Sequence, residues 1–179
     1  MRGRGIEYDK AMKPCSGVAQ EIERKFLVAN DGWRAGADQG RRLRQAYLAV
    51  TERAAIRVRI EDDIDAVLTV KSANPGLTRV EFEYPLPLRD AETLATLREG
   101  AVLQKTRFVV PHGGRDWEVD VYAGDNHGLV IAEIETETET ADVELPPWVG
   151  EEVTGEARYY AARLAMQPYR SWAPASAKH

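Results

Sequence analysis

The sequence contains one cysteine, Cys15, among 179 residues, so no disulfide can form within the chain. A reducing compartment such as the cytoplasm fits this cysteine usage. The three histidines, His112, His127 and His179, are scattered, which excludes the closely spaced ligands typical of a structural zinc site. No apolar run approaches the roughly 20 residues that a membrane-spanning helix needs, and no signal-peptide core is present. The sequence therefore predicts a cytoplasmic protein with no membrane partner.

An excess of basic residues is also missing. The 24 lysines and arginines stand against 29 aspartates and glutamates, which gives a net charge of −5 and no general attraction to nucleic acid. A glycine-rich phosphate loop of the Walker kind is absent as well. Hydrophobic residues make up 44% of the chain and charged residues 30%, as in an ordinary globular protein. This length predicts one domain with a substantial core.

What the sequence does contain is a charged strand pattern that recurs along the chain. In the first such segment, EIERKFLV at 21–28, apolar and charged side chains alternate as in a half-buried strand. The same alternation predicts seven further strands, at 42–50, 55–60, 66–71, 79–84, 104–110, 116–122 and 129–135. Apolar spacing and stop signals predict two helices, at 89–100 and 155–166. We expect a domain over 20–170, with a flexible leader at 1–19 and a flexible tail at 171–179.

The sign of the charge is segregated by strand. Arg57 and Arg59 share one strand, and Glu81 and Glu83 share another, whereas a solvated surface, which is the simpler explanation, usually mixes both signs. Neighbouring like charges are costly unless an ion of opposite sign lies between them. Strands of both kinds together predict a site for a polyanion and its divalent metal. About eight antiparallel strands can close a barrel, so we expect a mainly antiparallel α+β protein: an eight-stranded closed β-barrel with a charged interior and helices packed outside.

The same segments resemble a known family. Glu21-Ile-Glu-Arg-Lys25 is similar to the ExExK signature of the CYTH superfamily, the triphosphate tunnel metalloenzymes. The resemblance continues in order over roughly residues 20–170, through YL at 47–48, RVRI at 57–60, LTVK at 68–71, EFEYP at 81–85, KTRF at 105–108, WEVDVY at 117–122, LVIAEIE at 129–135 and PWVGEEVT at 147–154. It is greatest to the compact bacterial branch, whose members are similar to inorganic triphosphatases. This implies metal-dependent hydrolysis of tripolyphosphate to pyrophosphate and phosphate.

The resemblance also implies a role for each matching position. Six cations would bind the phosphates: Lys25, Arg57, Arg59, Lys71, Lys105 and Arg107. Mg²⁺ or Mn²⁺, which prefer carboxylate oxygens, would be bound first by Glu21, Glu23 and Glu135, with Glu133, Asp120, Glu81 and Glu83 as outer ligands or as a second metal site. Phosphoryl transfer requires mainly positioning and charge neutralisation, and this residue set supplies both.

The resemblance points to Lys71 with Tyr47 as the catalytic dyad that activates water. A lysine can act as a base only when its pKa is lowered, which neighbouring cations favour and glutamates oppose. The competing account makes Lys71 a phosphate ligand, with a metal-bound water as the nucleophile. Both accounts stay open on the sequence alone.

Other functions fit the same pattern: a class IV-type adenylate cyclase, a thiamine triphosphatase, or a non-catalytic polyphosphate-binding module. A cyclase must also recognise a base, and the sequence shows no distinctive base-reading segment. The acids retained in the matching strands argue against a binding module. Asp116 and Glu118 fit the site and a solvated hairpin equally, whereas the four tryptophans, Trp33, Trp117, Trp148 and Trp172, are expected to be packing residues. The organic part of the substrate and the oligomeric state, a homodimer included, are left open.

Overall fold

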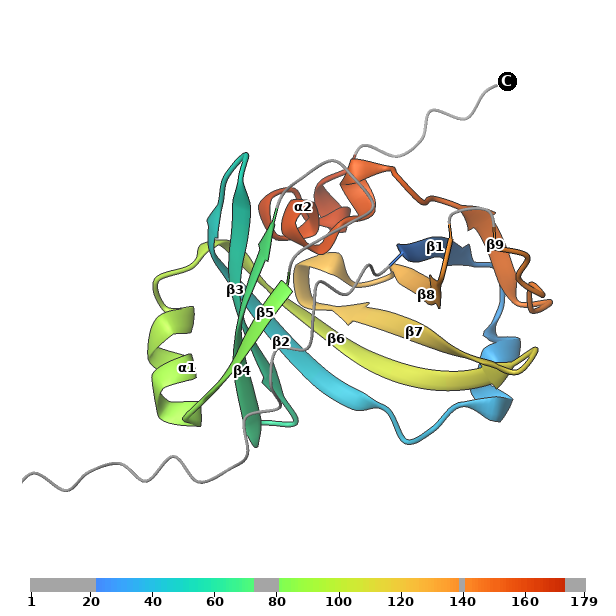
Figure 1. The fold of residues 1–179 in the computed structure, drawn as a ribbon, viewed down its shortest axis with the longest axis horizontal. Coiled ribbons are helices and arrows are strands. Elements are labelled where there is room, and N and C mark those ends of the chain that lie inside the picture. The colour runs from blue at the N-terminus through green and yellow to red at the C-terminus, as the bar shows by residue number, and fades with distance from the viewer. Residues whose placement is uncertain (1–21, 73–80, 139–140, 173–179) are drawn as a thin grey trace, which may run out of the picture.

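A computed structural model describes residues 22–72, 81–138 and 141–172 (Figure 1). It confirms a mostly antiparallel β protein with few helices. The strands are β1 (Ile22–Val28), β2 (Arg41–Val50), β3 (Ala54–Glu61), β4 (Asp65–Ser72), β5 (Glu81–Leu86), β6 (Glu99–His112), β7 (Arg115–Ala123), β8 (Val130–Thr136) and β9 (Val149–Glu152). The helices are α1 (Leu88–Ala95) and α2 (Ala161–Met166), with short 3₁₀ turns η1 (Asp31–Gly36), η2 (Gly124–Asn126), η3 (Ala157–Tyr159) and η4 (Tyr169–Ser171).

The nine strands form one bent sheet in the order β5-β4-β3-β2-β6-β7-β8-β1-β9 (Figure 1). The prediction of a closed eight-stranded barrel is therefore wrong, because β5 and β9 are the two edges of an open sheet. Closure would require a ladder of hydrogen bonds between those edges. Pro85 of β5 has no N–H to donate, and β9 is only four residues long. Alternation in a sequence specifies the faces of a strand but not whether the sheet closes.

Both helices are shorter than predicted. Residues 99–100 begin β6 instead of ending the first helix, and Gly100 has a φ of 69°, which favours glycine. The second predicted helix is a 3₁₀ turn followed by the six residues of α2. The predicted leader at 1–19 lies outside the described residues, as does the tail beyond Trp172. Among the helices that the structure describes, none is long and apolar enough to cross a membrane.

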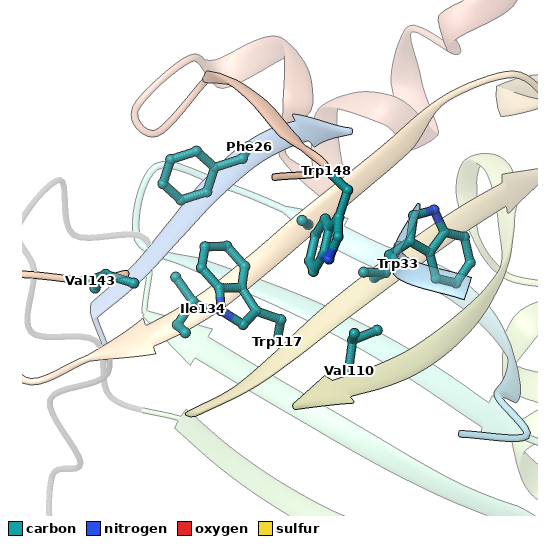
Figure 2. Packing of buried hydrophobic residues seen from close by; sticks show 9 residues of the cluster. Phe26, Trp33, Val110, Trp117, Ile134, Val143 and Trp148 are labelled. Atoms are coloured by element: carbon teal, nitrogen blue, oxygen red, sulfur yellow. The ribbon is translucent and has the colours of Figure 1, made fainter. Parts of the chain in front are cut away.

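One face of the sheet is apolar and carries two clusters. On the strands from β6 to β1, Phe26 and Trp117 pack at 5.5 Å between ring centroids, and Trp117 meets Trp148 edge-on at 5.6 Å (Figure 2). Trp33 of η1 belongs to the same cluster. On the strands from β2 to β5, α1 covers a second cluster that includes Val58. The tryptophans in these clusters are packing residues, as predicted.

The opposite face carries the predicted charged residues, and we call it the charged face. Its far end is apolar: Leu103 and Tyr122, which alternate in step with Lys105 and Asp120 of their own strands, pack with Leu164 of α2. Trp172 packs edge-on against Tyr159 and Tyr169 beside this helix. The expectation that all helices lie outside is thus correct for α1 and wrong for α2. A six-residue helix gains little stability from its own hydrogen bonds, so α2 is stabilised by burying its apolar side chains against this end of the sheet.

Candidate active site

Cross-strand pairing places the predicted site residues beside one another. In the β1–β8 ladder, Glu23 is opposite Glu135 and Lys25 is opposite Glu133. In the β6–β7 ladder, Arg107 is opposite Asp120. Residues directly opposite one another in antiparallel strands project to the same face. The β1–β8 ladder therefore joins charged residues that are more than a hundred residues apart in the chain, whereas Arg107 and Asp120 are 13 residues apart.

The other half of the sheet extends the same face. Arg57 of β3 is opposite Tyr47 of β2 and Thr69 of β4. Thr69 is in turn opposite Glu83 of β5, and Lys71 is opposite Glu81. Strand β2 connects the two halves, because it pairs with both β3 and β6. The predicted cations and acids of the described strands thus share one continuous surface. Glu21 lies outside the described residues.

The first half holds a dense ion-pair network. Lys25 Nζ lies 2.9 Å from a Glu23 carboxylate oxygen and also contacts Glu133. Arg107 donates to Asp120 at 2.8 and 2.7 Å and to Glu133 at 2.7 Å. Lys25, Asp120 and Glu133 are buried, so this charge is paired within the fold and little of it faces solvent. Removing one partner from such a network leaves an uncompensated buried charge.

Two further contacts complete this network. Lys105, which is buried, pairs with Asp120. Arg107 also pairs with Glu118. Glu118, which fitted either the site or a solvated hairpin, therefore belongs to the ion-pair network of the charged face.

The second half has a looser network. Lys71 Nζ lies 2.7 Å from one oxygen of Glu81, and Arg57 lies 3.8 Å from the other. Arg59 is 3.2 Å from Glu83, whose carboxylate also accepts a hydrogen bond from the hydroxyl of Thr69. The side chains of Lys71 and Glu83 are 31% and 40% exposed, so a ligand can reach them directly. All six predicted phosphate ligands are therefore paired with carboxylates.

Burial and pairing shift several pKa values in this face. Burial works to raise the pKa of Glu23, but the Lys25 ammonium and hydrogen bonds with Glu133 and Lys25 outweigh it and lower the pKa to about 2. Burial works to lower the pKa of Lys25, but Glu133 and Glu23 raise it above its ordinary value. The pKa of Arg107 is raised by Asp120 and Glu133 against the effect of burial. These groups remain charged throughout the physiological range.

Lys105 behaves differently. Burial lowers its pKa, and the nearby Arg107 acts in the same direction, while Asp120 opposes them. Its ammonium lies 5.6 Å from the ring centroid of Tyr122. Burial, together with Asp120, raises the pKa of the Tyr122 hydroxyl well above its ordinary value. The two residues of the predicted dyad lie on strands of the charged face that are separated by β3. Lys71 is on β4 beside Glu81, and Tyr47 is on β2 in the cluster under α2.

A pocket of about 360 Å³ opens at the acidic end of the charged face. It is lined by Glu23, Glu133 and Glu135, with Val109, Arg115, Asp116 and Glu118. Five carboxylates around one cavity are a donor set that suits a hard divalent cation. In the described residues, no group of three or more histidine, cysteine or acidic side chains already has the arrangement of a metal site. Lys25 contacts Glu23 and Glu133, and Arg107 contacts Glu133. Protein cations therefore already engage carboxylate oxygens of this pocket.

Sequence reasoning missed three residues of this face: Gln45, Thr69 and Tyr122. Each lies two residues from a predicted site residue on the same strand and therefore on the same face: Thr69 from Lys71, Tyr122 from Asp120, and Gln45 from Tyr47. Because they are uncharged, the sign of charge did not single them out. Their positions two residues from a predicted site residue were the available signal.

Comparisons of sequence agree with this geometry. The sequence profile of the CYTH domain matches residues 19–164. An inorganic triphosphatase of Acetivibrio thermocellus is 40% identical over 156 residues, a match that covers 87% of this chain and 99% of that protein. An inorganic triphosphatase of Nitrosomonas europaea is 38% identical over 151 residues, covering 82% of this chain and 97% of that protein.

Solved structures show the same likeness. The crystal structure of an inorganic triphosphatase matches with a TM-score of 0.62 at 33% identity, covering 87% of this chain and 97% of that chain. A putative adenylyl cyclase from Hippeastrum, described as having a dominant triphosphatase activity, matches with a TM-score of 0.52 at 15% identity, covering 66% of this chain and 80% of that chain. At that identity the second likeness shows the fold alone.

Proposed function

The chain belongs to the CYTH domain family, and on that premise we propose that it is a metal-dependent inorganic triphosphatase, which hydrolyses tripolyphosphate to pyrophosphate and phosphate. The observation that carries this proposal is the charged face itself, where six cations and an acidic pocket lie on one sheet surface. The inorganic triphosphatases that match over nearly their whole length support the substrate class.

The six cations would bind the phosphate oxygens by exchanging partners. Each now contacts a carboxylate: Lys71 contacts Glu81, for example, and Arg59 contacts Glu83. Phosphate oxygens offer the same charge-assisted hydrogen bonds, and arginine can give two in parallel. A chain of three phosphates carries enough negative charge to compete for all of these cations, which a single phosphate does not.

The acids of the pocket would hold the divalent cation. When bound, Mg²⁺ or Mn²⁺ neutralises charge on the phosphate oxygens. Glu23 and Glu135 line the pocket and sit opposite one another, and we assign them, with Glu21, as the first ligands. Glu133 and Asp120 are assigned as outer ligands, as are Glu81 and Glu83 in the second half. When phosphate takes Lys25 and Arg107, the carboxylates that these residues release become available to the metal, so the two ligands should assist each other.

The proton of the attacking water needs a base, and two lysines are candidates. Lys71 with Tyr47 is the dyad that the resemblance implies. Lys105 is the second candidate, because it is buried and burial lowers its pKa although the paired Asp120 opposes this change; a lowered pKa is the property a lysine base needs. Tyr47 lies in the same cluster as Tyr122, whose ring faces Lys105.

The proposed function is tested by phosphate release from tripolyphosphate, pyrophosphate, ATP and thiamine triphosphate, with Mg²⁺ or Mn²⁺, alongside an assay for cyclic AMP. We expect turnover to need added metal and to be fastest with tripolyphosphate. Undiminished turnover in excess EDTA would refute the metal requirement. Equal rates with pyrophosphate would refute the preference for three phosphates, and cyclic AMP formation from ATP would instead support the cyclase.

The cellular setting of this activity is part of the same proposal. A single cysteine supports a cytoplasmic location, and the negative net charge supports a small triphosphate, not nucleic acid, as the partner. We assign the activity to the domain at 20–170.

A further inference from the structure

Two buried polar atoms of the charged face have no hydrogen-bond partner among the described residues: Oε1 of Gln45 and Nε of Arg57. Gln45 is only 3% exposed. A buried acceptor or donor that is left unpaired is costly, so each such atom in a natural fold needs an explanation, such as a functional role or a bound water. Two other side-chain atoms share this property within the described residues, Nε2 of His112 and Nε1 of Trp117, and neither belongs to the site. The Gln45 and Arg57 atoms therefore need an explanation from the site.

The two side chains are close neighbours on this face. Gln45 is opposite Arg59, and Tyr47 is opposite Arg57, in the β2–β3 ladder. Gln45 and Arg57 are thus diagonal neighbours, whose Cα atoms are about 7–8 Å apart in an antiparallel sheet. Both side chains are long enough to reach a common point above the sheet.

The chemistry of the pair selects a particular ligand. The amide oxygen of Gln45 can only accept a hydrogen bond, and the Nε–H of Arg57 can only donate one. A phosphate oxygen would suit Arg57 but would be repelled by the Gln45 oxygen. A water molecule donates to one and accepts from the other, so it satisfies both atoms.

The position of the pair fits a reacting water. Gln45 is also opposite Leu103, which packs with Leu164 of α2. The pair therefore lies beside α2, on the strands that join the cations of the two halves of the charged face, so a phosphate chain bound to these cations would have a phosphoryl group within reach of the pair. In phosphoryl transfer the attacking oxygen lies in line with the bond that breaks, so this water must approach the phosphorus from the side opposite the leaving pyrophosphate.

We propose that Gln45 and Arg57 hold the water that attacks the terminal phosphorus. Its oxygen forms the new P–O bond, the bridging P–O bond breaks, and pyrophosphate leaves with the electron pair. The proton of the water passes to the site's base, because the amide of Gln45 accepts a hydrogen bond but takes no proton. This inference rests on the proposed triphosphatase function and adds a catalytic residue to it.

The test compares Gln45→Leu and Gln45→Glu with the matched control Gln104→Leu. Gln104 is exposed, on the neighbouring strand β6 and on the opposite face. In tripolyphosphate hydrolysis we expect Gln45→Leu to lower kcat at least about fiftyfold while KM changes less than about threefold. Gln45→Glu keeps an acceptor, so it should recover part of kcat, with a higher KM because its charge repels phosphate. Gln104→Leu should match the wild type.

The outcomes separate this inference from the proposed function. If the wild type does not hydrolyse tripolyphosphate, the proposed function fails first. If the wild type is active and folded Gln45→Leu retains its kcat, Gln45 does not hold the water. A raised KM with unchanged kcat would make Gln45 a phosphate ligand and would also overturn the proposal. Should Gln45→Leu fail to fold, Gln45→Glu decides, because it keeps a hydrogen-bond acceptor. A kcat above about 2% of the wild type at saturating substrate (a loss smaller than about fiftyfold) would support the proposal, and a lower kcat would overturn it.

Discussion

Glu23 is a carboxylate whose neighbours determine its charge. Lys25 lies 2.9 Å away, and it lowers the pKa of Glu23 to about 2 although burial acts to raise it. Because this pKa is lower in the folded than in the unfolded chain, the ionised side chain stabilises the fold at any pH above the ordinary value of 4.5. That stability is lost as the pH falls from about 4.5 toward 2.

We predict that Glu23→Gln lowers the metal-dependent turnover at least about a hundredfold. The substitution removes a proposed metal ligand, and its loss should reduce the stabilisation of the transition state by a few kcal/mol. It should also lower the free energy of unfolding at pH 7 by about 1 kcal/mol, allowing for a side chain that is about one-third exposed. Steady-state kinetics and urea unfolding between pH 3 and pH 7 measure both effects. The stability difference should shrink below pH 4.5.

Glu52→Gln is the control for this prediction, because Glu52 is an exposed carboxylate in the turn between β2 and β3. It should change neither quantity. A Glu23→Gln enzyme with near-normal turnover would place Glu23 outside the metal site, and a stability difference independent of pH would contradict its ion pair with Lys25.

The identity of the base is also a question at the residue scale, and arginine substitution answers it. Arginine retains the positive charge but does not deprotonate under assay conditions. We predict that Lys105→Arg loses most of kcat across the pH range, whereas Lys71→Arg mainly raises KM, because the Lys105 environment lowers its pKa and Lys71 is accessible to phosphate. Full pH–rate profiles of both variants provide the measurement. The reverse pattern would restore the Lys71–Tyr47 dyad.

At the scale of elements, the position of α2 depends on contacts distant in sequence. The buried side chain of Asn126 in η2 connects to both sides of the helix: its amide nitrogen donates to the carbonyl of Leu164 at 3.4 Å, and its oxygen accepts from the amide of Tyr169 at 2.8 Å. At Gly100, a Cβ atom would lie 2.4 Å from the carbonyl oxygen of Ala165. The backbone of β6 therefore needs glycine at this position for α2 to pack on it.

We predict that Gly100→Ala displaces α2 and lowers the free energy of unfolding more than Gly114→Ala does. Both glycines have positive φ, 69° and 73°, so alanine costs each about 1 kcal/mol in backbone strain. A Cβ at Gly114 meets nothing within 4 Å, so the difference between the variants isolates the contact with α2. We expect that difference to be at least about 1 kcal/mol. Urea unfolding followed by tryptophan fluorescence measures it, and equal losses would contradict the contact.

At the scale of the whole molecule, the charged face is held together by ion pairs that the proposed substrate and metal would both rearrange. Lys25 and Arg107 engage carboxylates of the acidic pocket. If phosphate takes these cations, the released carboxylates gain affinity for a metal, and the metal likewise frees the cations. Such coupling is reciprocal by thermodynamic necessity.

We predict that Mg²⁺ and a tripolyphosphate analogue with nitrogen bridges, which resists hydrolysis, stabilise the protein cooperatively. Each alone should raise the melting temperature by a small amount, and the two together by several degrees more than the sum. Thermal unfolding with neither, either and both ligands makes the comparison. Pyrophosphate is the control ligand, and a purely additive shift with the analogue would contradict the exchange of partners.

The sequence by itself determined the faces of the strands. The period of two in EIERKFLV, AIRVRI and DWEVDVY assigned charged and apolar side chains to opposite sides, and the structure bears this out in β1, β3 and β7. The same local pattern, with the order of motifs, was enough for the family. Alternation is a property of consecutive residues, which is why it can be read without knowing which strands are neighbours.

Only the tertiary structure decided which residues meet. The pairing of Lys25 with Glu133, the burial of Tyr47 under α2 and the open edges at β5 and β9 depend on contacts between distant segments. Gln45 entered the site for the same reason: an uncharged side chain carries no signal of sign, and only the neighbouring strands β3 and β6 placed it beside Arg59 and Leu103. Local preference specifies a strand and its faces, whereas register, closure and burial follow from the packing of the whole chain.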